Sequence, residues 1–349
     1  MIDQIKAILE EGVLQNAFPG GQFCLLKDGS ITCESVGYKA LYPEKIPNDG
    51  HEIYDIASLT KVVITTTLIM QLVEKKLLHL DDKVSVYLPQ FMHKDITIYH
   101  LLTHTSGMQA DIFNASMYRN KRSIFNTIYS LDKLREPGEY VIYSDINYLL
   151  LGEVIETVSK QPLDTVANEN IFNPLSMHDT SFRPDKNRCA PTERREDEVF
   201  NGLLQGVVHD EKSFALNGLS GHAGCFSTAY DLSLFMKDLL HENKLLSKDT
   251  VHELFKLREQ KPNLNGFMET RALGFDKPSV NSLTGNDFNF DDIIIHTGFT
   301  GCHMIIDRSQ NMGFVLLTNA VHPKRELNQI KAYRQAIGQV LFDKKGGTQ

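Results

Sequence analysis

The two ends of the chain are rich in strand-forming residues, whereas the long stretch between them is rich in helical patterns. Near the start, residues 20–26 and 31–38 flank Asp28-Gly29, and an Asp-Gly pair between two β-rich runs predicts a hairpin. Three more β-rich runs lie near the other end, at residues 292–296, 302–307 and 313–318. We therefore expect one sheet that draws its strands from both ends of the chain.

Helical periodicity is found at both ends and in the middle. At the start, one face of a helix would carry Ile2, Ile5, Ile8, Leu9 and Val13. Further helices are expected at residues 57–80, 148–158, 231–240 (capped by Ser227 or Thr228) and 325–342. The predicted fold class is α+β: an antiparallel sheet flanked by helices, an α/β/α sandwich, with an inserted all-helical subdomain. We assign residues 1–80 and 218–349 to the sheet domain and residues 81–217 to the helical insertion.

The charge balance argues against nucleic acid as a partner. The net charge of the 349 residues is −8, and a phosphate backbone requires concentrated lysine and arginine. No apolar stretch is long enough to span a bilayer, and the first residues lack the basic and apolar regions of a signal peptide. We therefore expect no nucleic-acid partner, no membrane span and a cytoplasmic location.

The five cysteines are scattered, and none of them forms a CxxC pair. An odd number without metal-type spacing favours free thiols in a reducing compartment, and we expect no metal site. A two-residue turn at Asp28-Gly29 would pair Lys27 with Ser30 and, further along the ladder, Cys24 with Cys33. We expect Cys24 and Cys33 to be neighbouring free thiols that only pack together.

Three short motifs could carry chemistry. The first is an S-x-x-K formed by Ser58 and Lys61 at the start of a buried helix. Residues three apart share one helix face, so the lysine amine can reach the serine hydroxyl. A serine hydroxyl is a weak nucleophile that needs a base, and a helix N-terminus favours developing negative charge. A serine N-cap with an extended lysine would explain this motif equally well when it is taken alone.

The second motif is Tyr143-Ser144-Asp145 before a helix, and the third is His296-Thr297-Gly298 at the end of a β-rich run, followed by Phe299. A tyrosine at the mouth of a helix can relay a proton. A glycine lets the backbone pass close to a substrate, so that the next N–H can enter an oxyanion hole. A core tyrosine and a strand histidine in a hairpin would explain these two motifs if each stood alone.

Together, and in this order, the three motifs resemble those of the superfamily of penicillin-binding proteins, class C β-lactamases and related esterases and D-alanyl-D-alanine carboxypeptidases. Similar stretches occur at residues 80–84, 98–107, 137–138 and 221–228, so the resemblance runs from about Phe18 to Asn319. The resemblance implies a β-lactamase/transpeptidase-like fold, no cofactor, and β-lactams as candidate acylating ligands.

The resemblance also implies a role for each catalytic residue. Ser58 would be acylated and then deacylated by water or another acceptor. Lys61 would accept the proton of Ser58, or supply the field that lets Tyr143 do so, and Tyr143 would pass the proton to the leaving group. The N–H groups of Ser58 and Phe299 would form the oxyanion hole.

Two positions depart from the family pattern. Asp145 stands where an asparagine is usual, and an ionised aspartate can only accept hydrogen bonds. It could hold Lys61 charged or accept an amide N–H from substrate. His296 stands where many members have lysine, and histidine is mostly neutral near pH 7. With Thr297, His296 would line the strand edge along which substrate lies.

The predicted function is that of a serine hydrolase that acts on a carboxylic ester or on an amide or peptide bond through an acyl-Ser58 intermediate. Small esters and cell-wall-derived muropeptides are the two substrate classes considered. The alternative is a non-catalytic module of the penicillin-binding type that only binds or scaffolds. His104 is expected to hydrogen-bond its own loop. His222, expected to be a core or loop residue, could instead border the pocket.

Overall fold

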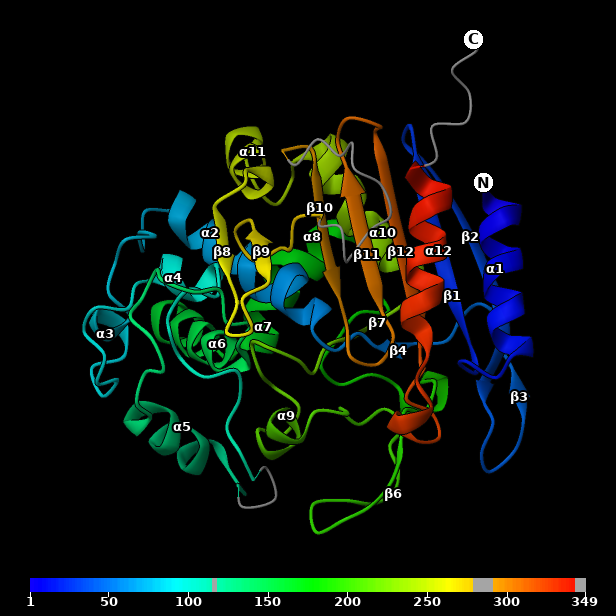
Figure 1. Ribbon diagram of the computed structural model, residues 1–349, viewed down its shortest axis with the longest axis horizontal. Coiled ribbons are helices and arrows are strands. Elements are labelled where there is room, and N and C mark those ends of the chain that lie inside the picture. The colour runs from blue at the N-terminus through cyan, green and yellow to red at the C-terminus, as the bar shows by residue number, and fades with distance from the viewer. Residues whose placement is uncertain (115–117, 279–290, 343–349) are drawn as a thin grey trace.

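A computed structural model describes residues 1–114, 118–278 and 291–342. Its main sheet has six antiparallel strands in the order β10-β11-β12-β1-β2-β3. The strands are β1 (Gly20–Lys27), β2 (Ser30–Ala40), β3 (Ile46–Pro47), β10 (Ile293–Thr297), β11 (His303–Asp307) and β12 (Met312–Thr318). Strand β1 pairs with β12, which confirms that both ends of the chain build one sheet (Figure 1).

Alternation along the strands divides the apolar side chains between the two faces of the sheet. One face, with Phe23, Phe314 and Leu316, is covered by α1 (Ile2–Leu14) and α12 (Ile330–Phe342). Only part of the predicted last helix is α-helical, because a 3₁₀ turn at Arg325–Leu327 precedes α12.

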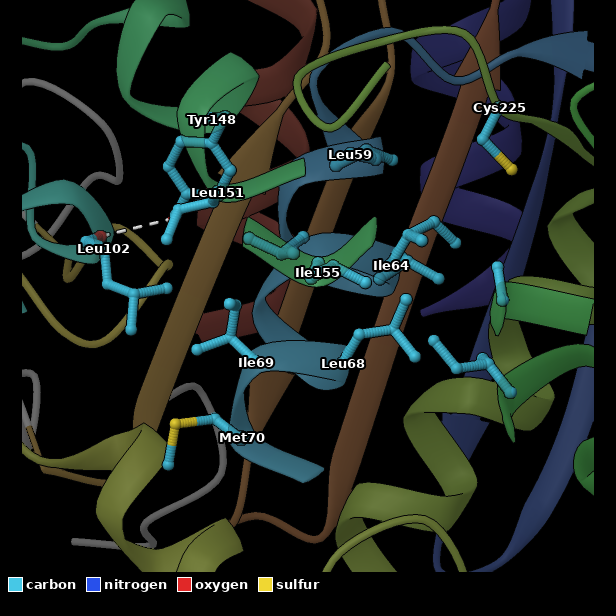
Figure 2. Close-up of a cluster of buried hydrophobic side chains, with 14 of the residues drawn as sticks. Leu59, Ile64, Leu68, Ile69, Met70, Leu102, Tyr148, Leu151, Ile155 and Cys225 are labelled. Carbon is cyan, nitrogen blue, oxygen red and sulfur yellow. Dashed lines mark hydrogen bonds between the residues drawn. The ribbon is translucent and has the colours of Figure 1, made fainter. Parts of the chain in front are cut away.

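The opposite face packs on the helices that follow the first strands. Its core is continuous from Cys24 and Val315 in the sheet to Leu68 in α2 (Thr67–Glu74) and Tyr148 in α6 (Asp145–Ser159) (Figure 2). The predicted helix at 57–80 is shorter than expected, since it ends at Glu74 and its first turns, Lys61–Thr66, are π-helical. Helix α10 (Ala229–Lys237) is capped by Thr228, whose side chain accepts from the Asp231 N–H.

Most of the regular secondary structure in the middle of the chain is helical. The remaining helices are α3 (Val84–Tyr87), α4 (Ile98–Leu102), α5 (Lys121–Ser130), α7 (Leu163–Ala167), α8 (Asn173–Leu175), α9 (Glu211–Ala215) and α11 (Lys248–Phe255). The short strands are β4 (Tyr54–Asp55), β5 (Arg194–Glu196), β6 (Asn201–Leu203), β7 (Phe226–Ser227), β8 (Glu259–Pro262) and β9 (Met268–Arg271). Because β5 and β6 form a hairpin, the 81–217 segment is not wholly helical; the domain boundaries stay a prediction.

The hairpin register is the predicted one, but the prediction of free thiols is wrong. Lys27 pairs with Ser30, and Cys24 pairs with Cys33. Directly paired residues point to the same face of the sheet, their Cα atoms lie 4.1 Å apart, and the two cysteines form a disulfide. The other three cysteines are free and buried. The five cysteines therefore include one disulfide-bonded pair, although their number is odd. With a disulfide present, the cysteines no longer indicate a reducing compartment. The cytoplasmic location stays a prediction.

Within the described part of the chain, no helix has both the length and the apolar character that a membrane crossing requires.

Candidate active site

Ser58 lies in a tight turn between strand β4 and the π-helical start of the buried helix. Strand β4 pairs with β7, and the Asp55 carboxylate accepts from the Ala57 N–H at 2.9 Å and from the His209 N–H at 2.8 Å. Ala57 has a φ of 46°, a left-handed conformation that costs a residue with a Cβ about 1 kcal/mol. Such strain persists only where the surroundings enforce it, often at functional sites. Here it leads directly into the Ser58 turn.

Lys61 lies one turn after Ser58 and is fully buried. Its ammonium donates to Ser58 Oγ at 2.9 Å and to the His222 carbonyl at 3.1 Å, and it lies 2.8 Å from Asp145 Oδ1. The side chain of Tyr143 is a further hydrogen-bond partner of this ammonium. The predicted contact between Ser58 and Lys61 is therefore present, and Asp145 completes it.

The charge of Lys61 follows from this environment. Burial favours the neutral amine, but Asp145 and Tyr143 outweigh burial, so the pKa of Lys61 is raised above its ordinary value. Asp145 is ionised in turn, because Lys61 overcomes the effect of burial and lowers the pKa of the carboxyl. An ammonium has no lone pair. In this state Lys61 can orient Ser58 and supply a field, but it cannot accept the serine proton.

Tyr143 reaches the same place from the helical region. Its ring lies 5.0 Å from Lys61 Nζ and packs on the ring of His104, with centroids 4.6 Å apart. His104 is buried, and its Nδ1 accepts from the Ser144 N–H at 3.0 Å. It therefore holds the segment that carries Tyr143 and Asp145, a structural role like the one expected for it.

The end of β10 approaches the nucleophile turn closely. A Cβ on Gly298 would lie 2.8 Å from the Ile56 carbonyl oxygen, so only glycine fits between the strand end and the turn. As a result Phe299, the next residue, lines the same cavity as Ser58. Thr297, at the end of the strand, is exposed and lines this cavity as well.

His296 is buried, and its Nε2 has no hydrogen-bond partner within the described structure. Burial, followed by the nearby charges of Arg271 and Lys61, holds the pKa of His296 well below its ordinary value. The imidazole is therefore neutral, as expected at this position. The local cation is instead the buried Arg271, which no sequence motif indicated.

Two adjoining cavities meet at this site. One, of about 710 Å³, is lined by Ser58, Asp145, His222 and Phe299 among others. The other, of about 620 Å³, extends along β10 past Ile295. The residues common to both cavities are Tyr143, Thr297, Lys331 and Arg334. Six of the eight predicted site residues line the first cavity; Lys61 and His296 are buried behind its wall.

A second buried lysine extends the charge network. Lys212 Nζ lies 2.8 Å from Asp111, 3.0 Å from Asp210 and 3.4 Å from Asp145. These partners outweigh burial and raise the pKa of Lys212. His222 Nε2 lies 2.8 Å from Asp210, so it does border the pocket.

Among the described residues, Asp145, Asp210 and His222 could together offer three ligand atoms to a cation. The Lys212 ammonium already lies against both of these carboxylates. Sequence reasoning named Asp145 and His222 but missed Asp210, because no motif or spacing connects Asp210 with either of them.

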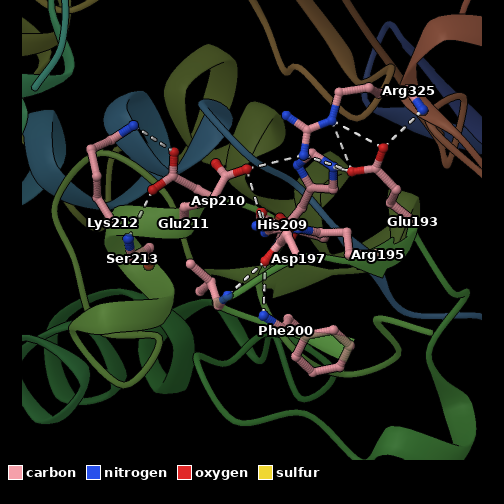
Figure 3. Close-up of polar contacts among 12 residues, drawn as sticks. Glu193, Arg195, Asp197, Phe200, His209, Asp210, Glu211, Lys212, Ser213 and Arg325 are labelled. Atoms are coloured by element: carbon pink, nitrogen blue, oxygen red, sulfur yellow. Dashed lines mark hydrogen bonds and ion pairs between the residues drawn. The ribbon is translucent and has the colours of Figure 1, made fainter. Parts of the chain in front are cut away.

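A further set of charged residues surrounds His209, Glu211 and Arg325, which also line the first cavity. Glu193 binds both His209 and Arg325, and Arg325 also reaches Glu211 (Figure 3). Its members lie just before β5, in the segment around α9 and in the 3₁₀ turn before α12. No motif indicated them, because only the folded chain brings these segments together.

Known proteins share this architecture. The family model described as Beta-lactamase matches residues 5–339. The chain is 31% identical to the N-acetylmuramyl-L-alanine amidase of Bacillus subtilis, over 87% of this chain and 78% of that protein. It is 30% identical to an Escherichia coli protein named "Putative D-alanyl-D-alanine carboxypeptidase", over 87% of this chain and 79% of that one.

Solved structures are similar over almost the whole chain. A penicillin-binding protein homologue from Pyrococcus abyssi has a TM-score of 0.77 at 22% identity, covering 97% of this chain and 77% of that one. A class C β-lactamase from Rhodobacter sphaeroides has a TM-score of 0.72 at 20% identity, covering 97% and 99%. At these identities the likeness concerns the fold.

Proposed function

The chain belongs to the β-lactamase family and is a serine hydrolase of that superfamily, and we propose that it hydrolyses an amide bond in peptidoglycan-derived fragments through an acyl-Ser58 intermediate. The two relatives at 30% identity or more carry names that refer to amide or peptide bonds of the cell wall. Their names favour an amide over a small ester.

The observation that carries the proposal is the contact between Ser58 Oγ and Lys61 Nζ, 2.9 Å apart at the wall of an open cavity. A module that only binds ligand has no need of a fully buried lysine beside a serine. Burying a charge is costly unless it is paired, and here the pair is Asp145, at 2.8 Å.

In the proposed acylation step, Ser58 Oγ attacks the carbonyl carbon and the C–N bond breaks. Tyr143 takes the proton of Ser58 while it gives its own hydroxyl proton to the leaving nitrogen, so that the amine departs neutral. Lys61 stays an ammonium and orients Ser58. The N–H groups of Ser58 and Phe299 stabilise the oxyanion.

In the deacylation step, water attacks the acyl carbon with the same oxyanion hole in place. Its proton returns to Ser58 through Tyr143, which releases a carboxylic acid and restores the enzyme. His296 contributes no charge to either step, because its imidazole is neutral. Asp145 acts through Lys61 by keeping it charged.

Product analysis tests this function. The protein is incubated with N-acetylmuramyl-L-alanyl-D-isoglutamine, with a peptide ending in D-Ala-D-Ala and with p-nitrophenyl acetate, and products are separated and identified by mass. Ser58→Ala is the control for background hydrolysis. We expect Ser58-dependent release of an amine from at least one of the amides. Cleavage of the ester without cleavage of either amide would contradict the proposal.

A further inference from the structure

Phe299 is an exposed aromatic ring in the wall of the catalytic cavity. Its side chain is 58% exposed, although it lines the same cavity as Ser58. A large apolar side chain exposed in a concave site generally marks a surface that a ligand covers. The role proposed for this residue in catalysis uses only its backbone N–H. The ring therefore needs a separate explanation.

The ring is held rigidly from behind. The imidazole of His209 is stacked on it, with centroids 5.5 Å apart and planes 29° apart. His209 is buried; its backbone N–H donates to Asp55 at 2.8 Å, and its ring Nε2 lies 2.9 Å from Glu193. A ring supported in this way presents a flat surface to the cavity at little entropic cost.

Arg325 lies over the same ring. Its guanidinium carbon lies 5.9 Å from the Phe299 centroid, and its nitrogens bind Glu193 at 2.6–3.0 Å and Glu211 at 3.0 Å. Figure 3 shows Arg325 between these carboxylates. The guanidinium is therefore already paired with carboxylates, and it holds the Phe299 ring in place.

The groups around the ring indicate what it binds. Asp210, Glu211 and Asn328 line the same cavity and offer acceptors and donors beside the aromatic face. A purely apolar ligand would desolvate these groups without replacing their hydrogen bonds. The lining of this cavity has five carboxylates, Asp55, Asp111, Asp145, Asp210 and Glu211, and four cationic side chains, Lys212, Arg325, Lys331 and Arg334. Lys212 and Arg325 are already paired with these carboxylates, so the cavity offers an anionic ligand little free positive charge. The cavity therefore suits an uncharged, hydroxyl-rich ligand with one apolar face.

A pyranose has this character. One face of the ring presents C–H bonds of partial positive charge, which suit the negative face of an aromatic ring, while its hydroxyls can bind carboxylates and amides. We propose that Phe299 is the stacking platform for a pyranose ring of the substrate, so that the enzyme prefers glycan-bearing amides. This inference rests on the proposed function, because it assigns the sugar to the same substrate whose amide Ser58 cleaves.

The adjoining cavity has fewer carboxylates and suits the rest of such a substrate. Its lining contains four cationic side chains, Arg271, Lys277 and the shared Lys331 and Arg334, against two acidic ones, Glu269 and Asp276. A peptide that bears carboxylates fits this arm better than an uncharged sugar does. The two cavities together thus match a fragment with a sugar on one side of the amide and an acidic peptide on the other.

Binding to a non-hydrolysing enzyme tests the platform. In the Ser58→Ala background, calorimetry compares N-acetylmuramyl-L-alanyl-D-isoglutamine with the same dipeptide capped by a lactoyl group, which lacks the sugar. We expect the sugar-bearing ligand to bind at least about fivefold more tightly, in line with the worth of one stacked ring. Equal affinity for the two ligands would overturn the inference.

Variants in the same background locate the preference. Phe299→Ala should abolish the preference for the sugar-bearing ligand, and Phe299→Trp should restore it, because tryptophan again supplies an aromatic face. Both variants keep the backbone N–H of the oxyanion hole. Phe267→Ala is the matched control, because Phe267 is 63% exposed and lines neither cavity; it should leave the ratio of the two affinities unchanged. A preference that survives Phe299→Ala would contradict the platform.

Hydrolysis by the Ser58 enzyme separates the two proposals. If both dipeptides are cleaved with equal kcat/KM, the amidase function stands and the platform is wrong. If neither is cleaved, but the sugar preference in binding is present and depends on Phe299, the platform stands and the proposed reaction is wrong. Any effect of Phe299→Ala on the oxyanion hole cancels in the ratio between the two substrates.

Discussion

Asp145 determines what Lys61 can do. An asparagine at this position could donate to a substrate, but it would leave Lys61 without a counter-charge. The carboxylate 2.8 Å from Lys61 Nζ raises the lysine pKa despite complete burial. The sequence allowed two roles for Lys61, as base or as a fixed charge, and the geometry favours the fixed charge. Sequence alone could not decide, because the sign of the shift depends on a distance.

Asp145→Asn should move the basic limb of the pH profile of Ser58 acylation to lower pH. In the native enzyme the raised pKa keeps Lys61 charged well beyond neutral pH, so Ser58 acylation should be lost only at strongly alkaline pH. Without the carboxylate, burial lowers the lysine pKa, and the loss should begin at least about one pH unit lower. The measurement is the rate of labelling by a neutral fluorophosphonate between pH 6 and 11.

Asp111→Asn is the matched control for this change. Asp111 pairs with Lys212 at 2.8 Å, whereas the carboxylate paired with Lys61 is that of Asp145, so removing the Asp111 charge should shift the basic limb less. An Asp145→Asn profile that coincides with that of the native enzyme, or a rate that rises as Lys61 loses its proton, would show that the ammonium is not the active form.

At the scale of elements, the site depends on how closely the end of β10 approaches the turn at Ser58. The sequence predicted both elements and the glycine between them. It could not predict that the glycine is needed for contact with Ile56, because that residue is far away in the chain. The unpredicted π-helical start at Lys61–Thr66 has the same origin, since tertiary packing decides it.

Gly298→Ala should separate these two elements. The new Cβ would lie 2.8 Å from the Ile56 oxygen and 3.3 Å from Ala57 Cβ, so the strand end must move and carry the Phe299 N–H with it. A displacement of this kind costs about tenfold to a hundredfold in kcat/KM. Ester hydrolysis by the folded variant provides the measurement.

Gly313→Ala serves as its control. It also adds a Cβ to a strand of the same sheet, but the nearest atoms belong to the Met236 side chain, with Cβ and Sδ both 3.1 Å away, and not to the turn at Ser58. Activity should change little there. Equal activity of the two variants would mean that the approach of β10 does not position the oxyanion hole.

At the scale of the molecule, distant segments are tied together at the catalytic cavity by buried ion pairs. Glu193, just before β5, binds His209 and Arg325. The sequence predicted the overall layout, with both termini in one sheet and a mainly helical middle, because hydrophobic periodicity is local information. The sequence could not predict these ion pairs, because pairing between charged residues that are distant in the chain leaves no periodic pattern.

Glu193→Gln should reduce stability at neutral pH but not in acid. Burial alone would raise the Glu193 pKa, but His209 and Arg325 lower it to about 2. A depressed pKa contributes stability above the unfolded-state value of about 4.3 that is lost as the pH falls towards 2. We expect the variant to lose about 2 kcal/mol at pH 6 and much less at pH 2.5, measured by urea unfolding.

Glu196→Gln removes a carboxylate three residues further along the chain, in β5, where Glu196 forms an exposed pair with Arg194. Exposed pairs contribute little, so this control should be close to the native protein at both pH values. A stability difference for Glu193→Gln that is the same at pH 2.5 as at pH 6 would contradict the depressed pKa.

The disulfide determines how many free thiols the whole molecule contains. With Cys24 joined to Cys33 and three free cysteines, the protein denatured without reductant should titrate three thiols, and five after reduction. Five thiols before reduction would restore the prediction of free thiols that the sequence made.

The central claim is that Ser58 is the nucleophile, and the most direct test compares Ser58→Ala with the native enzyme. We expect the variant to lose turnover of p-nitrophenyl acetate by several orders of magnitude. It should also gain no mass from a fluorophosphonate that adds one adduct to the native protein. Its unfolding free energy should change by only about 1 kcal/mol, because a serine at a helix start contributes no more. Native-like hydrolysis, or an adduct of the same mass on folded Ser58→Ala, would contradict the account.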